Sequence, residues 1–230
     1  VRAWADGRFV AVVAPTEALA DRVADQLRAV LAWADGPALP DAASLPAFLR
    51  SAPCDTTVTA QRGDAGPPTE GLRLSATYFK PYLAHASIGP SCAVARWDGA
   101  ALELWTHSQG IHNLRDDLVL ALARHHPPVA RDAITVHHVE GAGCYGHNGA
   151  DDVALDAVLM ALACPGVPVR VRWSRADELM HSPFGPAQRV ELSACVDAAG
   201  RLTHWQHQAW ASGYSSRPGR ARVPTLLAAS

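Results

Sequence analysis

The sequence predicts a mixed α+β protein, and three features of the chain support this. A β-like run at 134–139 passes through a glycine-rich stretch into a helix-like run at 153–164. Pairs of strand-like runs with turn residues between them predict β-hairpins at 92–105 and at 189–210. Strands and helices alternate without the regular period of a doubly wound parallel sheet, so we expect an α+β arrangement.

The N-terminal segment predicts a β-α-β unit. Apolar residues at 9–13 indicate a strand, residues 15–28 a helix opened by Thr16 and Glu17, and residues 30–33 a second strand. Apolar residues in the helix recur mostly at three- and four-residue spacing. We therefore expect the apolar face of this helix to cover the small sheet.

A linker and a larger domain follow. Residues 36–68 are rich in Pro, Ala, Asp and Gly and contain one short helix candidate at 45–50. Residues 72–79 alternate as a strand, so the larger domain is expected to start near Gly71. Its other predicted elements are hairpin strands at 92–97 and 101–105, a helix at 112–124, a strand at 167–173, a short helix at 176–180, and hairpin strands at 189–196 and 202–210.

Composition and charge are those of an ordinary globular protein. The 230 residues are 49% hydrophobic and 18% charged, which is enough chain to bury a core. The net charge of −2 and the pI of about 6.6 do not favour nucleic acid or an anionic membrane as a partner. No apolar run reaches the roughly twenty residues of a membrane span. Partners are expected to be proteins and small molecules.

The cysteines and histidines do not predict a metal site made of protein ligands. The five cysteines contain no C-x-x-C pair, so neither a zinc site nor an iron–sulfur cluster is expected, and their odd number disfavours a complete disulfide framework. Adjacent histidines occur at His125-His126 and His137-His138. Neighbouring side chains point in different directions on a helix or strand, so neither pair forms a chelate by itself.

The stretch from Glu140 to Asp152 predicts a ligand site. Its four glycines let the backbone adopt φ > 0 and approach a bound group, and the first N–H groups of the following helix, which have no intrahelical partner, can face an anion or oxo group. Tyr145 would be the one large side chain at this site. Asp151 and Asp152 are expected to be charge complements of the helix N-terminus. The pattern is neither a dinucleotide-binding nor a Walker A motif, and most glycine-rich turns only connect elements.

Five short segments, one of which is the glycine-rich stretch itself, occur together in this chain. They are Thr106-His107-Ser108-Gln109, Gly141 to Asp152, Trp173-Ser174-Arg175, Ser182-Pro183-Phe184-Gly185-Pro186 and Ser215-Ser216-Arg217-Pro218-Gly219. In this order they resemble the large subunits of molybdenum hydroxylases, the xanthine dehydrogenase and aldehyde oxidase family. The chain is most similar to the branch that contains nicotinate dehydrogenase and isoquinoline 1-oxidoreductase. The resemblance covers nearly all of the chain from about Gly71, and the first fifty residues more loosely.

The resemblance implies a domain organisation. Residues 1–50 would be the C-terminal part of an α/β hammerhead domain, residues 51–70 a linker, and residues 71–230 the N-terminal part of a mixed α+β molybdopterin-binding domain. The first four residues carry neither an initiator Met nor a signal-peptide pattern, and we interpret both ends as cuts in a longer protein.

The resemblance also implies a molybdenum-pyranopterin cofactor whose periphery is touched by protein groups that do not ligate the metal. Gln109 falls on the family glutamine that hydrogen-bonds an oxygen of the metal centre, a role that suits a neutral amide donor. Gly143, Cys144, Tyr145 and Gly146 fall in the loop that approaches the cofactor. Tyr145 also falls on the aromatic residue that stacks beside the substrate ring.

Several positions depart from the family pattern. Ala142, Cys144 and His147 interrupt the common all-glycine form of the loop. A cysteine beside a helix N-terminus can be a nucleophile, but no partnered base for Cys144 is identifiable and the family reaction uses no cysteine. His181 stands where xanthine-specific relatives carry a substrate-clamping Arg, which argues against a purine and makes His181 a candidate substrate contact.

The chain resembles only the first part of an active site. Nothing after Gly219 supplies the catalytic glutamate of the family, so no catalytic residue is assigned and the chain alone is expected to be inactive. Arg217 lies in a rigid turn, where it either faces a cofactor phosphate or only pins the end of the hairpin.

Two function classes remain open. The first is part of a molybdenum-cofactor oxidoreductase that hydroxylates an N-heterocycle of the nicotinate or isoquinoline type, or an aldehyde, with water-derived oxygen. Electrons would pass to a small [2Fe-2S] partner subunit and then to an acceptor such as cytochrome c. The second class is a non-catalytic interaction or assembly module that retains the fold. Neither class selects between a periplasmic and a cytoplasmic location.

Overall fold

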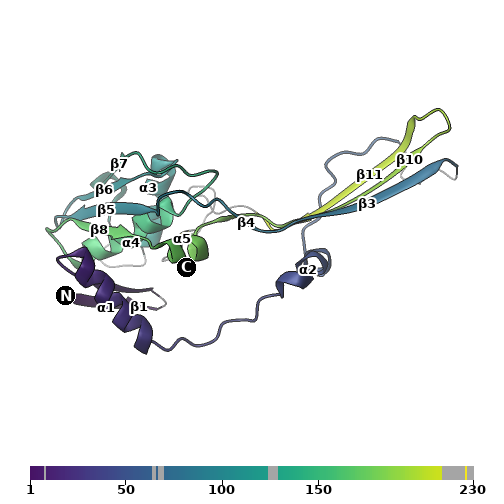
Figure 1. Ribbon diagram of the computed structural model, residues 1–230. Helices are drawn as coiled ribbons and strands as arrows, with labels where there is room; N and C mark the ends of the chain where they lie inside the picture. Colours follow the sequence, from purple (N-terminus) through teal and green to yellow (C-terminus); the bar gives the residue numbers. More distant parts are fainter. Residues whose placement is uncertain (8, 64–65, 67–69, 124–128, 214–225, 227–230) are drawn as a thin grey trace. The chain divides into compact units, whose positions relative to one another are not determined.

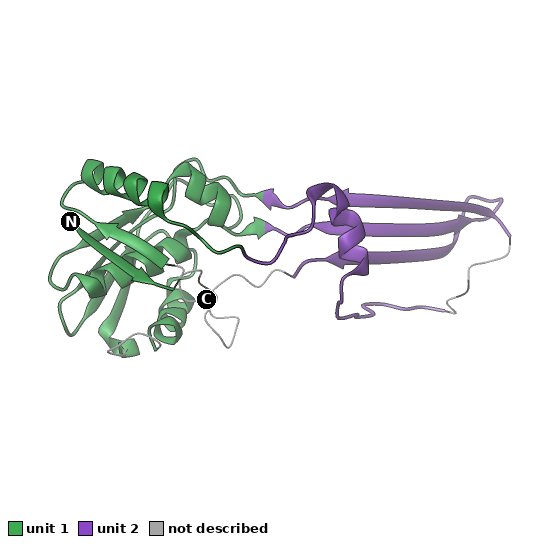
Figure 2. Ribbon diagram, turned by 90° about the horizontal axis from the view of Figure 1, so that it is seen from below, with its two compact units in different colours: residues 1–35, 84–184, 215–230 green, residues 36–83, 185–214 purple. Residues whose placement is uncertain are grey.

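Figure 1 shows the computed structural model of the chain, which describes residues 1–230 except 8, 64–65, 67–69, 124–128, 214–225 and 227–230. Helices and strands are mixed along the sequence and the strands form several small sheets, which confirms the α+β class. The chain divides into two compact units (Figure 2). Unit 1 contains Val1–Asp35, Ala84–Phe184 and Ser215–Ser230, and unit 2 contains Gly36–Leu83 and Gly185–Tyr214.

The main sheet of unit 1 has four strands in the order β7-β6-β5-β8. They are β5 (Cys92–Trp97), β6 (Leu102–Thr106), β7 (Ile134–His138) and β8 (Val169–Arg172). β5 pairs antiparallel with β6 and with β8, whereas β6 and β7 run parallel. The predicted hairpin between β5 and β6 is confirmed: Gly99 has φ +102°, and Asp98 Oδ1 accepts hydrogen bonds from the N–H groups of Ala100 and Ala101 at 2.9 and 2.7 Å.

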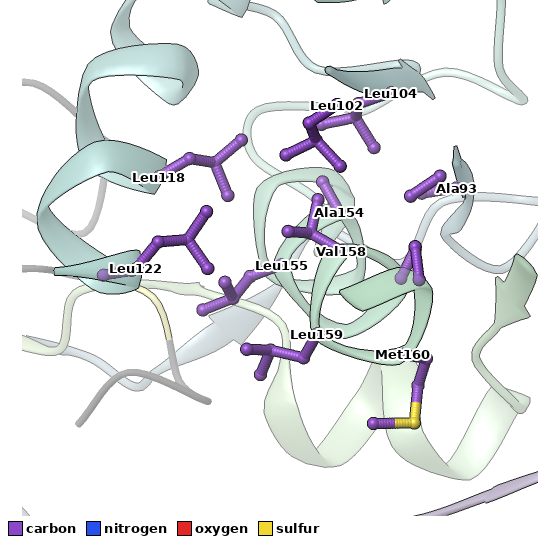
Figure 3. Close-up of a cluster of buried hydrophobic side chains, with 14 of the residues drawn as sticks. Ala93, Leu102, Leu104, Leu118, Leu122, Ala154, Leu155, Val158, Leu159 and Met160 are labelled. Atoms are coloured by element: carbon purple, nitrogen blue, oxygen red, sulfur yellow. The ribbon is translucent and has the colours of Figure 1, made fainter. Parts of the chain in front are cut away.

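Two helices pack with this sheet to form the core. They are α3 (Ile111–Leu122) and α4 (Ala150–Ala163), and most residues of α4 are buried. Leu118 and Leu122 of α3 point toward Leu155 of α4 in Figure 3, and Leu102 and Leu104 of β6 lie next to Ala154 of α4. Because α4 is surrounded by core side chains, the N-terminus of α4 is held in place. The same applies to the C-terminal end of the glycine-rich loop that precedes α4.

The N-terminal segment differs from the predicted β-α-β unit. An antiparallel pair, β1 (Arg2–Asp6) and β2 (Phe9–Val13), is followed by α1 (Glu17–Val30). The predicted strand at 30–33 is wrong, because α1 continues through Val30 and Leu31–Trp33 form neither helix nor strand. Strong helix formers such as Arg28 and Ala29 carry the helix past the point where Val30 suggested a strand.

The predicted start of α1 is confirmed by its cap. Thr16 Oγ1 accepts a hydrogen bond from the Leu19 N–H at 3.4 Å. The helix packs along β2, yet none of its residues is buried. The small sheet itself contributes to the core of unit 1, since Trp4 and Phe9 meet edge to face at 5.6 Å and pack against it.

Unit 2 contains a three-stranded antiparallel sheet in the order β11-β10-β3. The predicted strand at 72–79 and the predicted long hairpin are confirmed as β3 (Leu72–Lys80), β10 (Gln188–Val196) and β11 (Leu202–Ala211). The linker helix is also confirmed: α2 (Leu45–Ser51) follows the short η1 (Ala42–Ser44). Arg50 of α2 lies 3.1 Å from Glu191 and over the ring of Trp210, so α2 packs on the sheet face that carries these two side chains.

The opposite face of this sheet is apolar and exposed among the described residues. Strand pairing places its side chains in rows, with Leu74 opposite Ala194 and Ala194 opposite Trp205. Its most exposed members, each more than half exposed, are Leu72, Leu74, Tyr78, Leu202 and Trp205.

The remaining elements are short. β4 (Leu83–Ala84) pairs with β9 (Phe184–Gly185), and η2 (Arg131–Ala133) precedes β7. The predicted helix at 176–180 is confirmed as α5 (Arg175–His181). Two-residue strands carry no periodic signal, so β4 and β9 were not predicted. No helix in the described part of the chain is long and apolar enough to cross a bilayer.

Candidate functional site

The glycine-rich loop leads from β7 to α4 with a strongly curved backbone. Gly143 and Gly146 have φ +86° and +134°, and Tyr145 between them has φ +47°. The predicted positive φ is therefore confirmed at both glycines. Asn148, which is buried, closes the loop by donating from Nδ2 to the Gly143 carbonyl at 3.2 Å.

The other reason for glycine in this loop is close packing against aromatic rings of the same unit. An added Cβ would lie 2.2 Å from His85 Nδ1 at Gly146, 2.3 Å from the Trp173 ring at Gly149, and 2.7 Å from the His107 ring at Gly141. The expectation that Tyr145 is the one large side chain at the loop is therefore wrong. The three additional rings come from distant segments, which a local sequence pattern does not reveal.

A buried carboxylate of the chain itself faces the N-terminus of α4. Glu178 of α5 is 1% exposed and accepts hydrogen bonds from the Gly149 N–H at 3.4 Å, the Ser91 N–H at 2.9 Å and the Ser91 hydroxyl at 3.2 Å. The Ala150 N–H donates to Asn148 Oδ1 at 3.1 Å. The N–H groups of Gly149 and Ala150 therefore do not face an external anion, because Glu178 and Asn148 satisfy them.

The structure brings Gln109 to the loop. Gln109 follows β6, and its Nε2 lies 2.6 Å from the sulfur of Cys144, which is 35 residues further along the chain. Tyr145 is 60% exposed, and its carbonyl accepts a hydrogen bond from His85 Nδ1 at 3.1 Å. Gln109 therefore lies against residues 143–146, which contain Cys144, Tyr145 and the two glycines of positive φ. These four loop residues are called the loop apex below.

Asp151 and Asp152 lie in the first turn of α4, as expected for charge complements, but both are buried. The description of Asp151 as a charge complement is incomplete, because its Oδ1 also accepts a hydrogen bond from the Ser108 hydroxyl at 2.5 Å. The Asp151 carboxylate therefore connects α4 to the segment after β6, in addition to balancing the dipole of α4.

The remaining predicted residues lie elsewhere or outside the described residues. His181 is exposed at the end of α5, with its ring 6.2 Å from the ring of Trp173. Arg217 and the pair His125-His126 lie outside the described residues. The side chains of His137 and His138 differ in direction as predicted: His137 stacks on Trp105 at 5.0 Å, and His138 Nδ1 lies 3.1 Å from the Ser108 carbonyl oxygen.

Burial shifts the pKa of two groups beneath the loop. It lowers the pKa of His107, whose Nε2 accepts the Cys92 N–H at 3.3 Å and whose Nδ1 lies 3.2 Å from Asn148 Nδ2. Burial also raises the pKa of Asp156 to about 6, although the Trp173 Nε1–H donates to its carboxylate at 2.9 Å. Both shifts move the ionisation equilibrium toward the neutral form, because burial disfavours a charge.

Sequence reasoning missed the residues that hold the loop in place. Asn148 had a readable signal, since an Asn just before a helix commonly binds the first N–H groups. Glu178 lies inside a short helix that begins with a Ser174–Asp177 capping box, and it carried no signal of its own. His107 and Trp173 stand in segments that carry the resemblance, but no role was predicted for their rings, and His85 stands in none of these segments; the ring contacts depend on the tertiary fold.

The loop apex offers neutral hydrogen-bond donors to a bound group. Residues 140–143 and 145–146 are exposed, as is Gln109. An amide donor beside exposed backbone at positive φ fits a polar cofactor that is contacted at its edge. Within the described ranges, no three or more His, Cys, Asp or Glu side chains are grouped so that they could hold a metal ion.

Relatives of known function match this chain. Residues 52–229 match the family model of the molybdopterin cofactor-binding domain. The chain is 38% identical over 203 residues to a nicotinate dehydrogenase subunit from Pseudomonas putida, covering 87% of this chain and 16% of that protein. It is 32% identical over 141 residues to the aldehyde oxidoreductase molybdenum-binding subunit PaoC of Escherichia coli, covering 60% of this chain and 18% of that protein.

Solved structures include a chain with a similar fold. It is quinoline 2-oxidoreductase from Pseudomonas putida 86, with a TM-score of 0.52 and 18% identity over 61% of this chain and 18% of that one. The chain spans only 16% to 18% of the length of the two curated relatives. Because the family model matches well over half of the residues, the chain belongs to the molybdopterin cofactor-binding domain family of molybdenum hydroxylase large subunits.

Proposed function

We propose that this chain forms part of the cofactor site of a molybdenum hydroxylase that acts on an N-heterocycle of the nicotinate or isoquinoline type, or on an aldehyde, with water-derived oxygen. The observation that carries the proposal is the contact of the Gln109 amide with Cys144 at 2.6 Å, beside Gly143 and Gly146. These residues lie in the segment that matches the molybdopterin cofactor-binding domain.

Each residue at the loop apex has a proposed role. When bound, the molybdenum-pyranopterin cofactor supplies the oxygen-transfer and electron-accepting chemistry. Gln109 presents an uncharged N–H donor toward it, and Cys144 contacts the same amide and restricts its orientation. The backbone N–H groups between Gly143 and Gly146 approach the cofactor, and the exposed ring of Tyr145 packs beside a flat substrate.

Three further assignments rest on the family resemblance. His181 is proposed as a substrate contact and Arg217 as a cofactor contact. Residues 1–50 are proposed as the end of a hammerhead domain, with the linker at 51–70 and the molybdopterin-binding domain at 71–230. The two curated relatives are subunits by name, which supports a partner protein. We propose a small [2Fe-2S] subunit as that partner, with cytochrome c as one candidate acceptor.

The experiment that tests the proposal uses the full-length protein, purified with its partner subunits from a host that makes the cofactor. Molybdenum and pterin are measured per polypeptide, and dye reduction is measured with nicotinate, isoquinoline and an aldehyde in turn. We expect both components near one per polypeptide, turnover with one substrate class, and label from ¹⁸O-water in the product. A protein with neither molybdenum nor pterin would instead support the second class, an interaction or assembly module.

A further inference from the structure

A buried hydrogen-bond network joins the segment that carries Gln109 to the loop that carries Tyr145. We propose that Asp151 is the positioning residue of this network and sets the placement of Gln109 relative to the loop apex. The functional part of this inference rests on the proposed function, but its structural part does not.

The network is centred on a carboxylate with 3% exposure. Asp151 Oδ1 accepts a hydrogen bond from the Ser108 hydroxyl at 2.5 Å, and Asp151 Oδ2 lies 3.3 Å from Nε2 of His147. His147 is equally enclosed, at 2% exposure. Ser108 directly precedes Gln109, and His147 directly follows Gly146, so one carboxylate contacts both segments of the candidate site.

Ser108 connects Asp151 to the backbone on both sides of Gln109. Its hydroxyl oxygen also accepts the Gly110 N–H at 3.1 Å, and its carbonyl oxygen lies 3.1 Å from His138 Nδ1. The backbone before and after Gln109 is therefore tied to the hydroxyl that donates to Asp151. Gln109 itself is exposed, so its direction depends on these neighbours rather than on burial.

A carboxylate suits this position for two physical reasons. Its two oxygens accept hydrogen bonds from two directions at once, whereas an amide accepts with one oxygen only. The first turn of a helix also favours a negative charge, so α4 stabilises the buried carboxylate. Since α4 is embedded in the core, Asp151 provides a rigid base for both segments.

The structural part is tested by the alkylation rate of Cys144 in the full-length protein, measured by mass spectrometry of its peptide. Ser108→Ala and Asp151→Ala should release the Gln109 segment from Cys144 and raise this rate about threefold to tenfold, the worth of one hydrogen bond. The matched control is Thr106→Val, which removes another buried hydroxyl, one that donates to the Ala150 carbonyl at 3.2 Å. It should leave the rate unchanged, and the exposed Cys54 should react equally in all variants.

Equal rates in Ser108→Ala and Thr106→Val would overturn the inference, and this comparison remains available if Asp151→Ala does not fold. The functional part is tested in the metal-loaded enzyme by a double-mutant cycle. Ser108→Ala should lower kcat/KM about threefold to tenfold with Gln109 present and have no further effect in a Gln109→Ala background. Additive losses would show that Ser108 and Asp151 do not act through Gln109. A protein without cofactor but with the expected alkylation pattern would refute the proposed function alone.

Discussion

At the scale of single residues, the candidate site combines groups that the sequence could identify with groups that only the fold reveals. Gln109, Cys144 and Tyr145 were identifiable from the sequence, and the fold places them together. The residues that support them, such as Glu178 and His85, come from segments far along the chain. A contact between residues far apart in sequence has no local sequence signal, so the contacts of these supporting residues were not predicted.

Gln109→Ala tests the residue on which the proposed function depends most. In the full-length, metal-loaded enzyme it removes one neutral donor, worth about 1 to 3 kcal/mol, so kcat should fall about tenfold to a hundredfold. The fold should survive, because the side chain is exposed. Steady-state kinetics with metal content measured in parallel checks this. Unchanged turnover in a fully loaded variant would show that Gln109 has no role at the metal centre.

Asp156→Asn tests the half-buried carboxyl that accepts a hydrogen bond from Trp173 Nε1–H. The pKa of Asp156 is about 6 in the folded protein and ordinarily 3.8, so its stabilising contribution is full below pH 3.8 and is lost as the pH rises through about 6. An Asn avoids this loss. The variant should be more stable than the wild type at pH 8, by at most about 3 kcal/mol, and the difference should shrink toward pH 4.

Native-state hydrogen exchange of α4 in the full-length protein, corrected for the intrinsic exchange rates, measures this difference. Equal protection of the two proteins at pH 8, or a gain that increases toward acid, would contradict the assignment of a raised pKa to Asp156.

At the scale of elements, a central helix and a carboxylate from a short helix fix the loop. The hairpin at 92–105 and the strand–loop–helix order were predictable, because turn residues and apolar periodicity are local signals. The start of α4 at Ala150, three residues before the predicted one, was not. Asp151 and Asp152 resemble solvated residues in a sequence, yet the fold buries both.

Glu178→Gln tests the attachment of the loop end. The carboxylate accepts two backbone N–H groups, those of Ser91 and Gly149, on different oxygens. A Gln must turn its NH2 group toward one of them, so the variant should lose about 1 to 3 kcal/mol and exchange amide hydrogens faster at 140–149. The control is Glu103→Gln, because Glu103 is 41% exposed and lies 3.8 Å from Arg96. Loop exchange that is equally slow in both variants would refute this role.

At the scale of the whole molecule, the α+β class and most strand positions followed from the sequence, whereas the pairing of β3 with β10 did not. All strands of the four-stranded sheet lie between residues 72–80 and 188–196 along the sequence. Pairing of two strands so far apart in sequence depends on the complete fold. The first fifty residues gave a wrong topology, because β1 (Arg-Ala-Trp-Ala-Asp) contains no β-branched residue and ends in charged residues on both sides.

The apolar face of the sheet in unit 2 makes a prediction about the 230-residue chain. Contiguous exposed apolar surface binds hydrophobic dyes, whereas scattered exposed residues do not. Replacing Leu74 and Trp205 together by Thr should therefore reduce dye fluorescence at least about twofold. The control replaces Leu39 and Val58, which are 89% and 72% exposed but lie in irregular segments. Equal reductions in both double variants would show that this face does not dominate the exposed apolar surface.

The central claim is that the loop around Gly143 contacts the molybdenum cofactor, and cofactor content per folded molecule tests it most directly. Gly143 and Gly166 have nearly equal φ, +86° and +83°, but only an added Cβ at Gly143 meets other atoms, at 3.1 Å from the Tyr145 ring. Alanine at either position should therefore cost a similar backbone strain, about 1 to 3 kcal/mol. The full-length Gly143→Ala protein should contain little molybdenum and pterin per folded molecule, and Gly166→Ala should be loaded like the wild type. Full loading of Gly143→Ala would contradict the account.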